Sequence, residues 1–488
     1  MAVGFVSGIL LFETLAGINV LNKAFVPAAI ILSASAFIIA LILLKRKKTA
    51  LFLVVLSFSL AFVRMFFAVP HVVEAGYYHL SGTVSSSDTG KYFTVSGVKL
   101  NGRSHKYQIR LCLKDPDSGR PSLGDTIEAE VIVEKRFTGH SEADLNSLSA
   151  GRSITAECEN FETVSTGGLK LNRLVLFVRS AIGKRIRELF PDNSPIVTGF
   201  LLGDKSQMGY EELSSFRSTG TAHLLSLSGF HVGLISGFFL FVFPKRSRKL
   251  RFVFISLFLL CYCAVAAFPP SLVRASIMTA AVLSADLFDR RRDPLSSVSL
   301  AAVAILIVSP YELWSVGFRL SFAATLGIIF LSGIGDINSI SRAVNRLAQT
   351  IAVTFSAFAA TSLISARCFG YLSLYSLPAN LLALPVFSAA VIMCFAVLVI
   401  SFPFPAFAGL ISWVPDKLIG GAESALSWLA GLPYARLETA RPYAVSGFLL
   451  LILMFVISPY VLRPIKKRLL ASVPVFILFT LSIVLSII

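Results

Sequence analysis

The sequence predicts a polytopic α-helical membrane protein of about 11–13 membrane segments that carries one small extracytoplasmic all-β domain. The mean hydropathy of the 488 residues is +0.77, with 55% hydrophobic and only 15% charged residues. A soluble protein of this length would need far more charge to cover its surface. Apolar runs of about 20 residues recur along the chain, and each could cross a hydrocarbon core of about 30 Å.

Three apolar segments open the chain, near residues 3–20, 25–44 and 50–69. The loop before the third segment reads Lys45-Arg-Lys-Lys48, and short basic loops remain in the cytoplasm. We therefore expect residues 1–70 to form three transmembrane helices with a cytoplasmic amino terminus. The first segment contains Glu13 and lacks a basic start, which indicates a membrane helix and not a cleaved signal.

Residues 71–170 have a different, polar character. Polar and apolar residues alternate in the runs 106–114 and 127–133, and turn residues such as Asn101-Gly102 separate the runs. This period of two predicts a small β domain, which we place outside the cytoplasm. Five or six strands in about 100 residues suit a barrel of the OB type, with a small sandwich as the alternative.

The β domain is slightly acidic, with 11 Lys and Arg against 13 Asp and Glu, so it lacks the basic footprint typical of a nucleic-acid module. Three bases nevertheless share one predicted strand face, and they are the candidate DNA-binding residues: Lys106, Arg110 and Lys114. The alternative is that they form ordinary cross-strand pairs with acidic residues of a neighbouring strand, namely Glu128, Glu130 and Glu134.

The six cysteines are scattered and form no CxxC motif, which argues against a zinc site or a disulfide scaffold. Cys112 and Cys158 both fall in the extracytoplasmic domain. Because oxidising compartments favour disulfides, we expect these two residues to be paired. The alternative is two unpaired thiols, with Cys158 in the core.

Residues 171–219 are expected to form amphipathic interfacial helices. Apolar residues repeat at helical spacing across 173–190, surrounded by basic residues, as in helices that lie on a membrane surface. Ser194-Pro195 is typical of an N-cap followed by a first-turn proline, and a short apolar helix should follow to Leu202.

Residues 220–488 return to the bilayer. Candidate spans lie near residues 221–243, 252–268, 272–288, 296–309, 316–334, 348–366, 371–400, 404–430, 443–461 and 469–488. Prolines interrupt the stretches 371–400 and 404–430, so either could be re-entrant or a pair of half-helices. The bases of alternate loops by themselves match the net charge of +17. Membrane topology therefore explains the net positive charge. This charge is consequently no evidence for a polyanionic partner.

Polar residues inside these spans are the candidate functional residues, because polar groups at membrane depth are costly unless they face a partner or water. Residues 220–233 combine glycines, hydroxyls and two histidines, a pattern of tight helix packing or of a broken helix beside a pathway. Arg274 and Arg319 lie just inside apolar runs and could either snorkel or line a pathway for an anion. Asn380 lies between two prolines.

No catalytic or cofactor site is expected. His223 and His231 would lie about 12 Å apart along a helix, too far to chelate one metal. Ser226 and Ser228 have no acidic residue nearby in sequence, and hydroxyls in membrane helices usually bond their own backbone. The chain also lacks the GxxxxGK[ST] loop of phosphate-binding ATPases.

The chain resembles the ComEC-type competence proteins, which are membrane channels for DNA internalisation. The resemblance spans roughly residues 1–470. It rests on five motifs in a similar order and spacing: Phe200-Leu-Leu-Gly-Asp-Lys205, Thr219-Gly-Thr-Ala-His-Leu-Leu-Ser-Leu-Ser-Gly-Phe-His231, Arg274-Ala-Ser-Ile-Met278, Gly317-Phe-Arg-Leu-Ser-Phe322 and Leu377-Pro-Ala-Asn-Leu-Leu-Ala-Leu-Pro385. The metallo-β-lactamase-like domain that many members carry at the carboxy terminus is not found in this sequence.

The resemblance implies a multi-pass protein of the cytoplasmic membrane that takes up single-stranded DNA during natural transformation, with residues 220–488 as the channel domain. We expect one polar pathway lined by Asp204, Lys205, His223, Ser226, Ser228, His231, Arg274, Arg319 and Asn380. The expected partners are single-stranded DNA, the lipid bilayer, an extracytoplasmic DNA receptor and a separate cytoplasmic ATP-driven motor. A separate nuclease and a second copy of the chain are partners left open. The alternative function is a small-solute or lipid transporter on the same scaffold.

Overall fold

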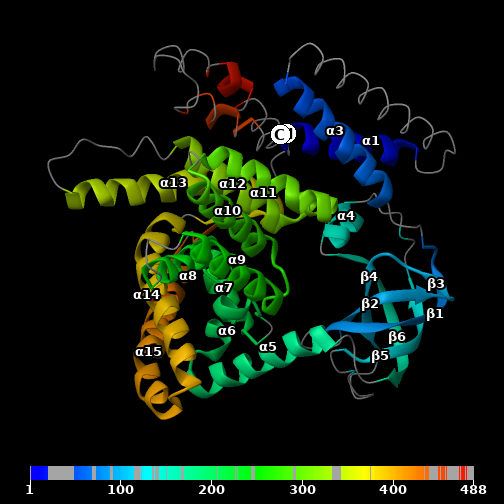
Figure 1. Cartoon of the computed structure of the whole chain (residues 1–488), viewed down its shortest axis with the longest axis horizontal. Coiled ribbons are helices and arrows are strands. Elements are labelled where there is room, and N and C mark those ends of the chain that lie inside the picture. The colour runs from blue at the N-terminus through cyan, green and yellow to red at the C-terminus, as the bar shows by residue number, and fades with distance from the viewer. Residues whose placement is uncertain are drawn as a thin grey trace. The chain divides into compact units, whose positions relative to one another are not determined.

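The structure is a computed structural model (Figure 1). It describes residues 2–19, 49–68, 73–87, 92–114, 121, 124–134, 137, 142–149, 151–165, 170–205, 207–225, 227, 229–242, 248–289, 293–331, 342–373, 375–433, 435–438, 449–450, 452–454, 456, 458, 472, 474–478 and 480. The chain divides into two compact units. The first comprises residues 1–178 and 299–315, and the second comprises residues 179–298 and 316–488.

The first unit begins with two packed helices, α1 (Ala2–Asn19) and α3 (Thr49–Ala68). They approach closely at Gly8, where a Cβ atom would lie 2.6 Å from the carbonyl oxygen of Phe58. Small residues permit such close contact between apolar helices. The predicted second span and the basic loop after it lie outside the described residues.

A small β-barrel follows. Its strands are β1 (Gly76–Ser87), β2 (Tyr92–Leu100), β3 (Arg103–Ser104), β4 (Gln108–Leu113), β5 (Thr126–Val133) and β6 (Arg152–Ser165), with helix α4 (Glu142–Ser149) between the last two. The sheet order is β1-β5-β6-β4-β2-β3, and an additional β1–β2 pairing closes the barrel. Strands β4 and β6 run parallel, whereas the other pairings are antiparallel.

Alternation along β5 decides which side chains fill the barrel. Ile127 and Val131 are fully buried, whereas Glu128 and Glu130 are exposed, as the period of two requires. The suggested cross-strand pairing of Glu128, Glu130 and Glu134 with Lys106, Arg110 and Lys114 is wrong, because β6 lies between β5 and β4. Glu128 instead lies 3.9 Å from the imidazole of His79 on β1.

The expected disulfide between Cys112 and Cys158 is absent. In the β4–β6 pairing, Cys112 is opposite Glu157 and Cys158 is opposite Leu113. A shift of one residue places the two side chains on opposite faces of the sheet. Cys158 is buried in the barrel, whereas Cys112 is half-buried on the other face, so the strand pairing itself prevents the bond.

Helix α3 contacts a later part of the chain within the same unit. Arg64 donates hydrogen bonds to the carbonyl oxygens of Ile307 and Val308, at 2.6 and 2.7 Å, where α11 (Pro294–Val308) ends. A cation that bonds the last carbonyls stabilises a helix terminus. The following 3₁₀ turn η1 (Pro310–Trp314) contacts both α3 and α4, and Tyr107 packs edge-to-face on Tyr311.

The second unit consists mainly of helices. They are α5 from Arg179 onward (Lys170–Leu189 in full), α6 (Ser194–Leu202), α7 (Tyr210–Ser218), α8 (Gly229–Val242), α9 (Arg248–Val265), α10 (Pro270–Leu287), α12 (Val316–Leu331), α13 (Arg342–Phe369), α14 (Ser376–Ser401) and α15 (Pro405–Ala430). A short ribbon pairs β7 (Tyr371–Ser373) with β8 (Arg436–Glu438). Among the described residues, the segments 348–369 and 378–401 are long and apolar enough to cross a membrane.

The long helices α14 and α15 continue through Pro385 and Pro415, where the sequence suggested half-helices. Asn193, and not Ser194, is the N-cap residue of α6, and its side chain makes no capping bond. The amide of Asn193 instead donates to the carbonyl and carboxylate oxygens of Asp416 on α15, at 2.9 and 2.8 Å. This contact joins α6 to the middle of α15.

Candidate functional site: a non-helical segment between packed helices

Between α7 and α8 the described residues 219–225 and 227 are not helical, although the sequence pattern predicted a span from residue 221. Together with Gly229, the first residue of α8, they form the segment described below. Helix α8 begins only at Gly229, and the described residues before it form turns. Gly220 has a φ of +69°, a conformation that favours glycine. The hydroxyls of Thr219 and Thr221 are 2.9 Å apart and fully buried. For residues 220–233 the sequence left two interpretations open, tight helix packing and a broken helix. The structure therefore favours the broken helix.

One end of this segment contacts the start of α14. A Cβ atom on Gly220 would lie 2.6 Å from the Cβ of Ser376 and 3.3 Å from the hydroxyl of Ser373. Asn380 donates through Nδ2 to the carbonyl oxygen of Ser376 at 2.7 Å. Within the part of the chain that the structure describes, three buried atoms here have no hydrogen-bond partner: Ser373 Oγ, Ser376 Oγ and Asn380 Oδ1. Buried polar atoms are normally bonded, so these three are available to water or a solute.

The other end of the segment contacts Arg274 of α10. The guanidinium donates to the carbonyl oxygen of Ser321 at 3.2 Å and to the hydroxyl of Thr325, both on α12. It lies 5.6 Å above the ring centre of Phe322, and a Cβ atom on Gly229 would be 3.4 Å from its Nη2. Three sequence motifs that are far apart in the chain thus meet at this one side chain.

The charge of Arg274 is buried, and no carboxylate of the described residues compensates it. Nothing among the described residues forms an ion pair with it, and its Nε atom has no acceptor there. Burying an uncompensated charge costs several kcal/mol. An anion bound beside α10 and α12 would offset this cost, and it is the ligand class that the arrangement can accept.

Helix α6 forms another wall of the site. The ring of His231 on α8 stacks on Phe200, with ring centres 6.4 Å apart. The hydroxyl of Tyr262 on α9 donates to the carbonyl oxygen of Leu201 at 2.9 Å. His231 is therefore a packed, buried histidine at the junction of α6 and α8.

The remaining predicted lining residues lie in different settings. Asp204 is 3.6 Å from Arg179 of α5. Burial, together with the charge of Arg217, lowers the pKa of the Lys205 amine below its ordinary value. His223 is exposed and Arg319 is half-buried on α12. Ser226 and Ser228 lie outside the described residues.

The structure thus connects Arg274 and Asn380 through opposite ends of one segment, and whether the nine predicted residues line a single pathway stays a prediction. Sequence reasoning missed Ser373, Ser376 and Thr325, because lone hydroxyls in apolar runs usually bond their own helix. The described residues contain no group of three or more His, Cys, Asp or Glu that could hold a metal ion.

Comparison with known proteins identifies the family. A family model described as "Competence protein" matches residues 200–464, which is more than half of the chain. The chain belongs to the Competence protein family. The Competence region begins within α6 at Phe200 and extends beyond β8, so it includes the whole segment 219–229 and every contact to it described above.

A curated relative of this Competence family chain is ComE operon protein 3 of Bacillus subtilis strain 168. The two are 27% identical over 289 residues, which are 58% of this chain and 36% of the relative. The match therefore covers only about a third of that protein's length. No solved structure matches the chain.

Proposed function

We propose that this protein is a membrane channel for the uptake of single-stranded DNA across the cytoplasmic membrane during natural transformation. The observation that carries the proposal is the buried guanidinium of Arg274, which has no carboxylate partner among the described residues and lies where three motifs meet. A phosphate group is the anion that a DNA strand would supply. Membership of the Competence protein family supports the choice of DNA.

The proposed topology is multi-pass, with a cytoplasmic amino terminus and an extracytoplasmic β-barrel. Two contacts within the first unit support it. Arg64, near the end of α3, bonds the last carbonyls of α11, and η1 contacts α4 beside the barrel. These contacts support a topology in which the end of α3, the turn at η1 and the barrel lie on the side without basic loops.

We assign the barrel to the OB type and propose that it receives the strand. The five-stranded closure and the parallel β4–β6 pairing support this assignment. Such barrels bind single strands largely by stacking bases on aromatic rings. Arg110 lies 4.2 Å from the ring centre of Tyr92 and with it could form such a platform. The amine of Lys106 already donates to the carbonyl oxygen of Phe67. Burial, and to a smaller extent the charge of Arg64, lowers the pKa of this amine. We therefore favour Arg110 over Lys106 as the DNA-binding residue.

Import of DNA requires an energy source. Moving one negative charge inward against an inside-negative potential costs about 2.3 kcal/mol per 100 mV, and a strand carries many phosphates. The sequence has no nucleotide-binding loop of the GxxxxGK[ST] type. We therefore propose that a separate cytoplasmic ATP-driven motor pulls the strand and that an extracytoplasmic receptor delivers it.

A second candidate is a transporter of a small solute or lipid. The observation that favours it is tight burial, since the exposed fractions of Arg274, Asn380 and His231 are 7%, 8% and 1%. A small anion could reach Arg274 through a narrower opening than a polynucleotide requires.

Transformation frequency tests the proposal. A naturally transformable strain that lacks this protein would be complemented with wild type, Arg274→Gln, Arg319→Ala or Arg248→Gln. Arg248 is the matched control, an arginine whose partners are the Asp286 carbonyl and the Asp289 carboxylate. Losing a charged hydrogen bond costs about 1.5–3 kcal/mol, so Arg274→Gln should lower the frequency about tenfold or more while Arg248→Gln does not. Normal transformation by the uncomplemented strain would contradict the DNA channel, and the small-anion candidate would then be tested with labelled solutes in liposomes.

A further inference from the structure

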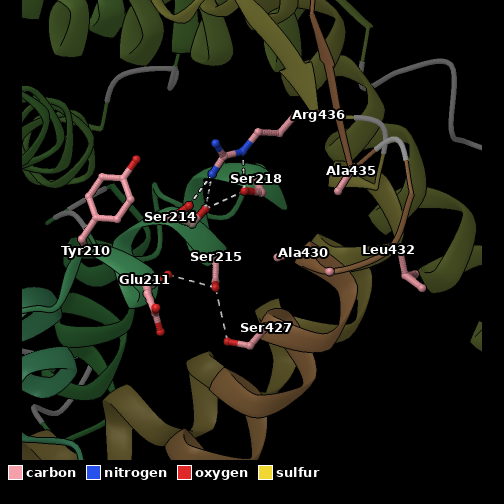
Figure 2. Close-up of a pocket in the computed structure, with 11 residues that line it drawn as sticks. Tyr210, Glu211, Ser214, Ser215, Ser218, Ser427, Ala430, Leu432, Ala435 and Arg436 are labelled. Atoms are coloured by element: carbon pink, nitrogen blue, oxygen red, sulfur yellow. Dashed lines mark hydrogen bonds between the residues drawn. The ribbon is translucent and has the colours of Figure 1, made fainter.

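A second polar site lies within the second unit, between α7, the end of α15 and β8 (Figure 2). It is a pocket of about 580 Å³, within the size range of small-molecule sites. Hydroxyls and small residues line most of it, including Ser214, Ser215, Ser218, Ser427, Ala430 and Gly431. No residue of this pocket belongs to the predicted channel lining.

Arg436 forms one end of the pocket. Its Nε donates to the hydroxyl of Ser218 at 2.6 Å, and its Nη2 donates to the carbonyl oxygen of Ser214 at 3.2 Å and to the hydroxyl of the same residue. The guanidinium also lies 5.5 Å from the ring centre of Tyr371 on the paired strand β7. The side chain is thus held in place by α7 and β7, while its Nη1 atom has no acceptor among the described residues.

The other polar groups indicate at which end of the pocket an anion would bind. Ser427 donates to Ser215 at 3.3 Å across the gap between α15 and α7. Figure 2 shows the Glu211 side chain pointing away from Arg436, so an anion would bind at the Arg436 end and not beside the carboxylate. Tyr210 lines the same pocket and is 81% exposed, which leaves its ring free to stack.

We infer that this pocket binds one nucleotide unit of the single strand, with the phosphate on Arg436 and the base on Tyr210. The inference rests on the proposed function, and it adds a binding site outside the channel lining. The Nη1 N–H groups of Arg436 can form a charge-assisted hydrogen bond to a phosphate oxygen, hydroxyls can bond the sugar and phosphate, and base stacking on an aromatic ring tolerates any sequence. A lipid headgroup also carries phosphate, but among the described lining residues the aliphatic side chains are Ala430, Leu432 and Ala435, which offer little surface for an acyl chain.

Photo-crosslinking tests the pocket directly. The full chain in phosphatidylcholine nanodiscs would be irradiated with single-stranded DNA that contains 5-iodouracil, and the crosslinked residues would be identified by mass spectrometry. We expect a crosslink at Tyr210. Arg436→Gln should reduce the yield of this crosslink about fivefold or more. It should also reduce the slope of log binding constant against log salt concentration by about one, as expected for the loss of one phosphate contact. Ala430→Trp should reduce the yield by filling the pocket without changing Arg436.

Control variants separate this inference from the proposed function. Arg248→Gln should leave the Tyr210 yield unchanged, and crosslinks to the barrel at Tyr92 should persist in all variants. DNA crosslinks elsewhere with none at Tyr210, or a Tyr210 yield unaffected by either pocket variant, would overturn the pocket alone. The absence of every crosslink would overturn the pocket and the DNA channel together. Loss of the Tyr210 crosslink in phosphatidylglycerol nanodiscs would show that a lipid headgroup occupies the site, and this also would overturn the inference.

Discussion

Gly220 and Ser376 are so close that a Cβ atom added to the glycine would lie 2.6 Å from the Cβ of the serine. The glycine belongs to the segment before α8, and the serine is the first residue of α14. The segment before α8 and the start of α14 therefore meet without an intervening side chain. The left-handed backbone of Gly220 adds a second reason why only glycine fits there.

Gly220→Ala should separate the segment before α8 from the start of α14. The added methyl group would clash with the Ser376 side chain and make a tight contact with that of Ser373, and the positive φ would add backbone strain of about 1–3 kcal/mol. We expect a lower thermal midpoint of the purified protein and loss of transformation. Gly233→Ala is the control, because a Cβ atom there meets nothing within 4 Å and alanine favours a helix. Equal stability of the two variants would contradict the close approach.

Hydropathy patterns were enough to predict a small β domain and apolar helices, because burial repeats every two residues in a strand and every 3.6 residues in a helix. The alternation across Ile127–Val133 identified a strand that the structure gives as Thr126–Val133. The prolines of α14 and α15 misled the interpretation. A proline can remain inside a long helix when neighbouring helices and side chains bond the freed carbonyl groups, and this compensation is tertiary.

The contacts of the candidate site could not be read from spacing. Arg274 was identified as a candidate because a charge in an apolar run is costly, yet its contacts to Ser321, Thr325 and Phe322 depend on how α10 packs against α12. Likewise the location of Cys112 and Cys158 in one domain suggested a disulfide, but only the register of β4 against β6 shows why Cys112 cannot reach Cys158.

Asn193→Ala should destabilise the contact between α6 and α15. The substitution removes two hydrogen bonds to the buried Asp416, and a hydrogen bond to a charged group contributes about 1.5–3 kcal/mol. Asp192→Asn is the neighbouring control, since Asp192 pairs with Lys417 at 3.0 Å on the exposed surface, where ion pairs contribute little. Thermal midpoints in detergent should fall for the first variant and remain near wild type for the second. A larger loss in Asp192→Asn would refute this ranking.

Thiol labelling should distinguish the two cysteines of the barrel. Without any reductant, a maleimide should modify Cys112, which is half-buried, and should reach the buried Cys158 only after unfolding. Cys112→Ser should leave the thermal midpoint unchanged, because the side chain forms no disulfide. A mass consistent with an intact disulfide, or a large loss of stability in Cys112→Ser, would show that the strand register is different.

Glu312 should make the stability of the first unit depend on pH. Burial raises the pKa of this carboxyl from 4.5 to about 7, although a hydrogen bond from Ser315 acts in the opposite direction. Its Oε2 atom is buried without a hydrogen-bond partner among the described residues. Because the folded state binds the proton more tightly than the unfolded state, the stabilising contribution is complete below pH 4.5 and declines as the pH rises to about 7.

Glu312→Gln should abolish this decline, and the difference from wild type should be visible in hydrogen exchange of peptides from η1 and α4, which are in contact. Glu438→Gln, on the exposed strand β8, should keep the wild-type profile. If the stability of Glu312→Gln declined between about pH 5 and 7 as that of wild type does, another titrating group would be responsible for the decline.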